Sequence, residues 1–188
     1  AASIHYRVTG KTNFMQIARH AADYLYGVFC ENREAFQHAG HNPSQIMALV
    51  DLYRLTGEER YLVLARTFVD LRGALPEGTD QNQSRVKLRS EQEAVGHAVT
   101  AAYLYCAATD VFAETGEAEL WQAMQRIWWD MTSKKMYING GIGTLHTGVS
   151  PRGDRVSEAF GAPYQLPSKS AYCETCANIA NAMWNKRL

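Results

Sequence analysis

The sequence carries no excess charge of either sign: its 188 residues include 19 lysines and arginines against 19 aspartates and glutamates. Proteins that bind nucleic acids or anionic membranes usually present a basic surface, so this balance argues against both kinds of partner. The chain also lacks an apolar run of the roughly 20 residues that a membrane-spanning helix needs. What remains, with 46% hydrophobic and 20% charged residues, is the composition of a globular protein.

Cysteine is scarce as well. The four cysteines, Cys30, Cys106, Cys173 and Cys176, are too few and too irregularly spaced for a disulfide-stapled scaffold, so we expect reduced thiols. Cys106 lies in the apolar run AAYLYCAATDVF and is predicted to be a small core residue. Cys173 and Cys176 differ from it, because they flank Glu174 in the motif CETC.

A repeated pattern indicates helical hairpins. Residues 6–23 and 53–70 read YRVTGKTNFMQIARHAAD and YRLTGEERYLVLARTFVD, which share Tyr, Arg, Thr, Gly, Ala, Arg and Asp in register. Residues 113–130 hold a looser third copy, AETGEAELWQAMQRIWWD. In each copy a glycine ends one periodic stretch and an amphipathic stretch begins at once. This is the pattern of a helix with a glycine C-cap, a tight turn and a second helix.

Apolar residues recur at helical spacing along most of the chain, and no segment shows sustained period-two alternation. We therefore predict an all-α fold, with one domain over residues 1–188 built of helix pairs that form either an open solenoid or a closed toroid. The residues predicted to share buried helix faces are Phe14, Ile17, Ala18, Ala21, Leu25 and Val28; Ile46, Leu49, Val50 and Tyr53; Leu62, Ala65, Phe68 and Val69; Val95, Ala98, Val99, Ala102 and Tyr105; and Leu120, Met124, Ile127 and Trp128.

Two polar, turn-rich stretches, residues 73–90 and 138–170, interrupt the helical pattern. Long irregular segments inside a compact helical frame are usually functional. The second stretch contains NGGIG, which lacks the Gly-Lys-Ser/Thr of a phosphate-binding loop. Tight turns beside a ligand-facing surface explain these glycines better.

The CETC motif is open to three interpretations. A redox pair needs a βαβ setting that is absent here, and a structural zinc site needs four ligands where this motif supplies half a site at most. Two buried thiols at a helix start are the third possibility. In a helix, Cys173 and Cys176 share a face and Glu174 diverges; in an extended or turn segment, Glu174 and Cys176 lie on one side. Zinc accepts carboxylate and thiolate together.

Three further residues are candidates for chemistry. Glu158 in SEAFG is either an exposed loop carboxylate or a general acid, whose pKa a partly apolar cleft would raise. His41 precedes Pro43 and a predicted helix, and His97 lies near another predicted helix start. Each histidine either reaches a ligand at the helix ends or caps its helix.

Four motifs together resemble the bacterial β-L-arabinofuranosidases of glycoside hydrolase family 127 over nearly the whole chain. They are GHNPSQIMALVDLYRLTG, EQEAVGHAVTAAYLY, KMYINGGIGT and SEAFGAPYQLPSKSAYCETCANIANAMWN. The resemblance implies that the helix pairs belong to an (α/α)6 toroid. It also implies a retaining glycosidase that takes a carbohydrate substrate and uses Zn²⁺ to bind a cysteine nucleophile.

The resemblance also assigns roles to individual residues. It implies that Glu158 is the general acid/base, and that Glu174 and Cys176 are zinc ligands with Cys173 as a neighbour only. His41 and His97 are implied to contact the sugar. The implied mechanism is a double displacement, in which the thiolate attacks the anomeric carbon and the glutamate first protonates the leaving oxygen and then activates water.

The sequence departs from this family in places. The family's nucleophile is one of two adjacent cysteines downstream of CETC, and this chain contains no Cys-Cys pair. We therefore expect an incomplete central portion of the catalytic domain that lacks the nucleophile, is inactive by itself and exposes toroid faces that self-associate or pair with missing segments. YQLPS replaces the family's usual Tyr-Glu-Leu-Pro-Asn, and VSPRGDRV precedes Glu158 as an extra segment, which leaves the exact sugar open.

Two other functional classes are compatible with the helical pattern. A non-catalytic helical-repeat module that binds sugars or a protein would need no metal and would be indifferent to Cys176→Ser. Another α/α-toroid enzyme, such as an unsaturated uronyl hydrolase or a sugar epimerase, would work with Asp or His and leave CETC unexplained.

Overall fold

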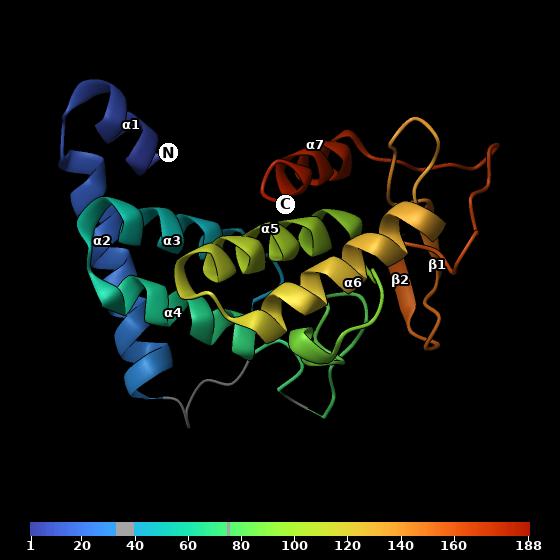
Figure 1. Cartoon of the computed structure of the whole chain (residues 1–188), viewed down its shortest axis with the longest axis horizontal. Coiled ribbons are helices and arrows are strands. Elements are labelled where there is room, and N and C mark those ends of the chain that lie inside the picture. The colour runs from blue at the N-terminus through green and yellow to red at the C-terminus, as the bar shows by residue number, and fades with distance from the viewer. Residues whose placement is uncertain (33–39, 75) are drawn as a thin grey trace.

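Figure 1 shows the computed structural model, which describes residues 1–32, 40–74 and 76–188. Helices dominate it, and most of them form three consecutive hairpins. These are α1 (Ala2–Thr9) with α2 (Asn13–Tyr26), α3 (Ser44–Thr56) with α4 (Glu59–Asp70), and α5 (Ala98–Thr115) with α6 (Ala118–Lys134). The other elements are a π-helical turn η1 (Gly27–Glu31), a 3-10 turn η2 (Leu88–Ser90), strands β1 (Leu145–Val149) and β2 (Arg155–Ala159), and helix α7 (Thr175–Asn185).

Glycine ends the first helix of each hairpin, as the sequence pattern predicted. Gly10, Gly57 and Gly116 adopt left-handed φ angles of 70°, 71° and 67°, and each amide donates to the carbonyl of the residue four positions earlier. An L side chain is disfavoured in this conformation, whereas glycine adopts it without strain. The predicted repeat of helix, glycine cap and helix is therefore confirmed.

Helix α5 is the centre of the core and contacts α3, α4, α6 and α7. Small residues on it, among them Ala101, Ala102 and Ala108, have no exposed surface, which lets the neighbouring helices approach closely. Figure 1 shows α7 lying along α5. The fully buried Trp184 secures this contact, because its ring lies 4.8 Å from that of Tyr105 and its Nε1 donates to the Thr109 hydroxyl at 3.0 Å.

The predicted buried faces of α3 to α6 are correct, but the face predicted for α2 is wrong except at its end, where Leu25 packs against the core. Phe14 is 49% and Ile17 64% exposed, whereas Met15 and Ala22 are buried. The contact face of α2 is turned by about one residue, roughly 100°: Met15 and Ala22 belong to the hydrophobic core, and α2 contacts α1 and α4.

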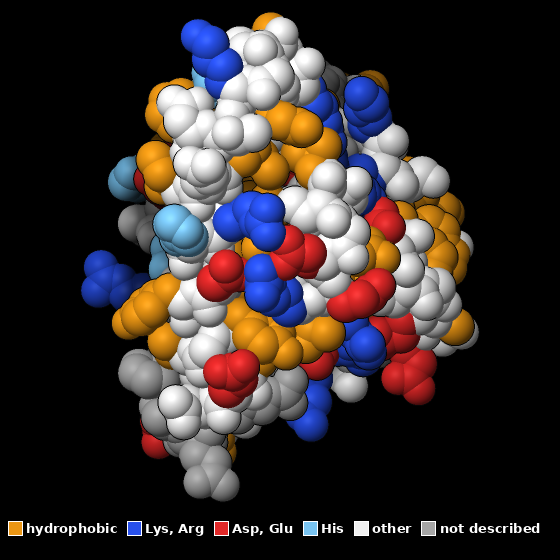
Figure 2. Space-filling model, turned by 90° about the vertical axis from the view of Figure 1, so that its left-hand side faces the viewer, with side chains coloured by type: hydrophobic (Ala, Val, Ile, Leu, Met, Phe, Trp, Pro, Cys, Tyr) orange, Lys and Arg blue, Asp and Glu red, His pale blue; other side chains and the backbone are white. Residues whose placement is uncertain are grey.

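Apolar side chains therefore remain exposed at this end of the molecule. Figure 2 looks onto the end that carries α1 and α2 and shows hydrophobic side chains at several places on the surface. The exposed apolar residues of these two helices are Ile4, Tyr6, Val8, Phe14, Ile17 and Tyr24. Such exposure was expected of an open arc of helical hairpins; self-association through it stays a prediction.

The stretch 138–170 was predicted to be irregular, yet it contains a β-hairpin. Strands β1 and β2 are antiparallel, with Leu145 opposite Ala159 and Thr147 opposite Ser157. The strands are five residues each, too short for period-two alternation to be visible in the sequence. A turn signal, Ser-Pro-Arg-Gly-Asp, was present between them.

The tip of this hairpin is attached to the other irregular stretch by ion pairs. Arg152 Nη1 lies 2.9 Å from Asp80 Oδ1, and its Nη2 lies 2.6 Å from Glu91 Oε1. Asp80 is fully buried and accepts a further hydrogen bond of 2.7 Å from the Ser150 hydroxyl. The extra segment VSPRGDRV thus holds the hairpin against residues 80–91.

Among the described residues, none of the helices combines the length and apolar character needed to cross a bilayer.

Candidate active site

Glu158 lies where the hairpin meets the N-terminus of α5. It is the second-last residue of β2, and the strand register places it opposite His146 of β1. A bridge between His97 and Ala159, and a 3.0 Å hydrogen bond from the Phe160 amide to the Gly96 carbonyl, join β2 to the start of α5. Glu158 itself has φ 51°, a left-handed conformation that is uncommon for a non-glycine residue and is concentrated at functional sites.

Both oxygens of the Glu158 carboxylate accept hydrogen bonds. The Tyr172 hydroxyl donates to Oε1 at 3.0 Å, and His97 Nε2 lies 2.8 Å from Oε2. His97 is the N-cap of α5, where its Nδ1 accepts the Thr100 amide at 3.4 Å. Because Nδ1 acts as an acceptor, the proton of the neutral ring resides on Nε2 and is donated to Glu158. His97 therefore caps α5 through Nδ1 and contacts a candidate catalytic residue through Nε2, so the two interpretations of this histidine do not exclude each other.

These two hydrogen bonds lower the pKa of Glu158. Tyr172 contributes most and His97 next, since both donate to the charged form. The general-acid interpretation had expected an apolar cleft that raises the pKa, and this expectation is wrong for the free site. The side chain is 37% exposed, so desolvation is too weak to outweigh its two donors.

His41 lies beside this pair. Its ring centroid is 5.7 Å from that of His97 in an edge-to-face arrangement. Desolvation by burial, with the proximity of His97 and Arg72, lowers the pKa of His41. Arg72 is buried, and its Nη2 donates to the carbonyls of Gly40 at 2.6 Å and His41 at 3.4 Å. The structure therefore brings both predicted histidines together with Glu158.

Glu174 and Cys176 form a second pair. Helix α7 begins at Thr175, and Glu174 is its N-cap with an extended backbone (φ −57°, ψ 139°). This is the extended alternative, in which the two side chains lie on one side, and Cys176 Sγ donates to Glu174 Oε1 at 2.7 Å. The carboxylate raises the pKa of the Cys176 thiol. The second oxygen, Glu174 Oε2, is buried and has no hydrogen-bond partner.

Cys173 is held by the glycine-rich turn. Its amide donates to the Gly143 carbonyl at 2.9 Å, and a Cβ placed on Gly141 would lie 3.3 Å from its sulfur. Burial raises the pKa of this thiol. The tight turn NGGIG thus packs directly against the CETC segment, as a turn beside a ligand-facing surface should.

The Glu174–Cys176 pair has the donor chemistry of half a zinc site. Zinc takes thiolate and carboxylate ligands together, and the orphaned buried oxygen of Glu174 is a free acceptor for a cation. Within the described ranges, no group of three or more His, Cys, Asp or Glu side chains is placed to hold a metal. The pair therefore fits zinc as two ligands of a tetrahedral set.

Tyr172 connects the two pairs. The Glu158 carboxylate raises the pKa of Tyr172 most, and Glu174 and Cys176 raise it as well. The Tyr172 ring also lies 5.1 Å from that of His146 in an edge-to-face contact. Sequence reasoning missed Tyr172 and His146. The sequence signal for Tyr172 was its position two residues before Glu174. His146 could have been found only from the strand register, and the strands had not been predicted.

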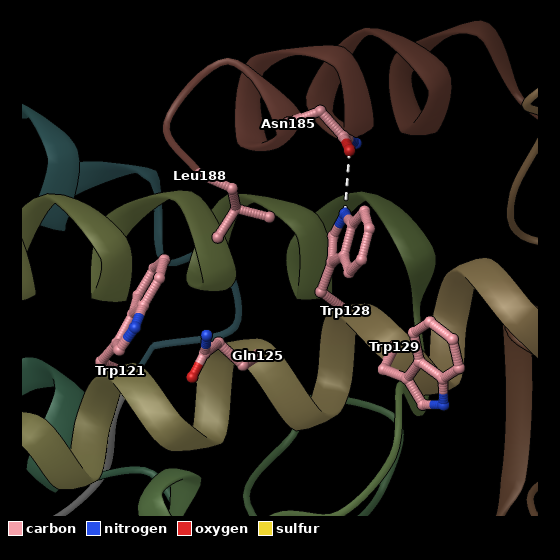
Figure 3. Close-up of a pocket in the computed structure, with 6 residues that line it drawn as sticks. All are labelled: Trp121, Gln125, Trp128, Trp129, Asn185 and Leu188. Atoms are coloured by element: carbon pink, nitrogen blue, oxygen red, sulfur yellow. Dashed lines mark hydrogen bonds between the residues drawn. The ribbon is translucent and has the colours of Figure 1, made fainter.

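A separate hollow lies between α6 and the end of α7. Figure 3 shows Trp121, Gln125 and Trp128 of α6 facing Asn185 and Leu188, with the Trp128 indole donating to Asn185 Oδ1 at 2.9 Å. None of the described side chains that line it is titratable. It offers apolar surface but no acid, base or nucleophile.

The described structure thus combines helical hairpins with a hydrogen-bonded carboxylate, Glu158, and a nearby thiol–carboxylate pair. The family model described as beta-L-arabinofuranosidase, GH127 catalytic domain, matches residues 1–188. The chain belongs to this family, whose solved members are (α/α)6 toroids.

Known relatives agree with this assignment. A non-reducing end beta-L-arabinofuranosidase of Bifidobacterium longum subsp. longum is 29% identical over 209 residues, which cover 100% of this chain and 30% of that protein. Among solved structures, one described as a glycoside hydrolase superposes with a TM-score of 0.90 at 42% identity, covering 98% of this chain and 32% of its own.

A GH127 beta-L-arabinofuranosidase from Geobacillus stearothermophilus T6 superposes with a TM-score of 0.84 at 32% identity, covering 99% of this chain and 31% of its own. The chain thus spans about a third of the length of the relatives that it matches.

Proposed function

We propose that this chain is part of the catalytic domain of a retaining glycoside hydrolase that cleaves terminal β-L-arabinofuranosides or a related rare sugar. The observation that carries the proposal is the Glu158 carboxylate, held by His97 and Tyr172 beside the Glu174–Cys176 pair. Family membership and the activities for which two of the relatives are named support the choice of sugar.

Glu158 is the proposed acid/base. In the first step its proton goes to the leaving oxygen, and in the second its carboxylate takes a proton from the attacking water. The ionised form that its two donors favour is the form needed for the second step. Bound sugar would exclude water from the exposed part of the carboxylate, and such desolvation raises a carboxyl pKa, which favours the protonated form for the first step.

Glu174 and Cys176 are the proposed zinc ligands of this chain. A bound zinc ion keeps a coordinating thiol deprotonated at neutral pH and fixes its position. The remaining ligands, among them the cysteine that acts as nucleophile, are proposed to lie outside these 188 residues. By itself the chain would then be inactive.

His41 and His97 are the proposed sugar contacts. Both ring nitrogens of His97 have protein partners, the Thr100 amide and Glu158, so a sugar hydroxyl would have to displace one of them. No hydrogen bond to a ring nitrogen of His41 is found among the described residues, which leaves that ring free to contact a ligand. His41 is thus the better placed of the two.

The test uses the full-length zinc-loaded protein to which this chain belongs. Glu158→Gln should lower the hydrolysis of p-nitrophenyl β-L-arabinofuranoside by about 10²- to 10⁴-fold, the usual contribution of a general acid/base, while the zinc content stays constant. Glu119→Gln, at an exposed position on α6, is the matched control and should leave turnover unchanged. Retained turnover in Glu158→Gln would contradict the acid/base assignment.

Metal analysis separates this proposal from a non-catalytic binding module. Glu174→Gln and Cys176→Ser should each reduce the bound zinc, because a tetrahedral site that loses one of four ligands binds more weakly. A full-length protein that contains no zinc and is indifferent to Cys176→Ser would favour the binding module.

A further inference from the structure

Backbone hydrogen bonds hold Tyr172 in place, independently of the contacts that its side chain makes. Its amide donates to the Thr144 carbonyl at 3.2 Å, and the next amide, that of Cys173, donates to the Gly143 carbonyl at 2.9 Å. Residues 172–173 are therefore tied to the segment that enters β1. Because β1 pairs with β2, the strand of Glu158, the tyrosine and the glutamate are positioned by the same hairpin.

The ring of Tyr172 has a restricted orientation as well. It meets His146 edge-to-face at a centroid distance of 5.1 Å, and its hydroxyl reaches Glu158 Oε1 at 3.0 Å. His146 lies opposite Glu158 in the strand register, so the tyrosine ring, the histidine ring and the carboxylate form one group at the end of the hairpin.

We propose that Tyr172 is a positioning residue, whose hydroxyl fixes one oxygen of Glu158 while His97 fixes the other, so that the carboxyl group keeps one orientation through both steps of hydrolysis. This inference rests on the proposed function. A glutamate side chain has three rotatable bonds, and a single donor would leave its carboxyl plane free to rotate. Two donors, one on each carboxylate oxygen, remove that freedom.

The hydroxyl can be removed without removing the ring. Tyr172→Phe keeps the contact with His146 and the backbone hydrogen bonds, while the hydrogen bond that it deletes ends on a carboxylate that is 37% exposed and can be satisfied by water. The urea unfolding midpoint should therefore stay close to that of the wild type. Tyr24→Phe on α2, at a 72% exposed position, is the matched control.

The experiment measures kcat and KM of the full-length zinc-loaded protein on aryl and alkyl β-L-arabinofuranosides. Tyr172→Phe should lower kcat by about 10- to 100-fold, the range expected when a catalytic group is misplaced by up to about 1 Å, with KM within about twofold. The loss in kcat/KM should be largest for alkyl leaving groups, which need protonation, and smallest for 2,4-dinitrophenolate, which does not.

A variant that keeps wild-type kcat, or that loses kcat/KM equally for every leaving group, would overturn the proposal.

A second measurement does not depend on activity. In protein labelled with ¹³C at glutamate carboxyls, the Glu158 resonance, assigned by its absence in Glu158→Gln, should move in Tyr172→Phe and stay in place in Tyr24→Phe. An unmoved resonance would refute the contact. If the wild-type protein hydrolyses no arabinofuranoside, the proposed function is refuted. The Glu158 resonance still tests whether the Tyr172 hydroxyl contacts Glu158.

Discussion

Gly96→Ala is the substitution for which the structure gives the sharpest prediction. Gly96 precedes His97, has φ 71°, and its carbonyl accepts the Phe160 amide. A Cβ at this position would lie 1.8 Å from the Asp80 carbonyl oxygen and 2.8 Å from the side-chain nitrogen of Gln83. Alanine therefore needs both a strained φ and a movement of neighbouring backbone.

The two costs can be separated. The left-handed φ costs about 1 kcal/mol for an L residue. Relief of the clash requires a shift of about 1.5 Å, since ordinary carbon–oxygen contacts begin near 3.3 Å. Asp80 is buried and bound to Arg152, so this movement would disturb an ion pair, and we expect a further ~3 kcal/mol.

The matched control is Gly116→Ala. Gly116 has φ 67° and no atom within 4 Å of the added Cβ, so it should lose only the ~1 kcal/mol of strain. Urea unfolding of the two variants in one background, followed by far-UV circular dichroism, should give free energies of unfolding that differ by about 3 kcal/mol. Equal unfolding midpoints would show that the close approach of residues 80 and 96 is not as described.

Three further predictions concern the core and the titrating groups. Trp184→Ala should destabilise the protein by about 3–5 kcal/mol, because it removes a fully buried indole between α7 and α5; a loss below about 1 kcal/mol would contradict this packing. Burial raises the pKa of Cys106 to about 12, so its thiol should resist alkylation at pH 8 until the protein is unfolded, and peptide mapping that finds it labelled in native protein would count against the core assignment. The Arg89 guanidinium lowers the pKa of Glu117, so this carboxylate stabilises the fold above its unfolded pKa of about 4.3 and loses that effect as pH falls through its folded pKa. Glu117→Gln should therefore unfold at lower urea than wild type at pH 7, and the difference should shrink as the pH is lowered below about 4.3.

Local signals in the sequence were sufficient for the helical hairpins. Gly10, Gly57 and Gly116 mark the turns because a left-handed cap needs glycine, and this requirement does not depend on the rest of the fold. The buried face of α2 was misassigned because periodicity shows which residues could be buried, whereas the neighbouring helices decide which are. Phe14 and Ile17 are as apolar as any core pair and still lie on the outside.

The site was predictable only in part. Glu158, His41 and His97 were singled out from motifs, and the structure brings them together. The direction of the Glu158 pKa shift could not be predicted, because its donors come from positions 61 and 14 residues away in the chain. His146 was missed for the same reason: its place opposite Glu158 follows from a strand register, and five-residue strands leave too little pattern to reveal one.

We propose that one glutamate, Glu158, serves first as acid and then as base. Both roles are tested by the intact mass of full-length Glu158→Gln after mixing with 2,4-dinitrophenyl β-L-arabinofuranoside. This leaving group departs without a proton, so we expect a burst of dinitrophenolate and a protein heavier by one arabinofuranosyl group, because the attacking water then lacks its base. Steady turnover with no mass increase, at the wild-type rate, would contradict it.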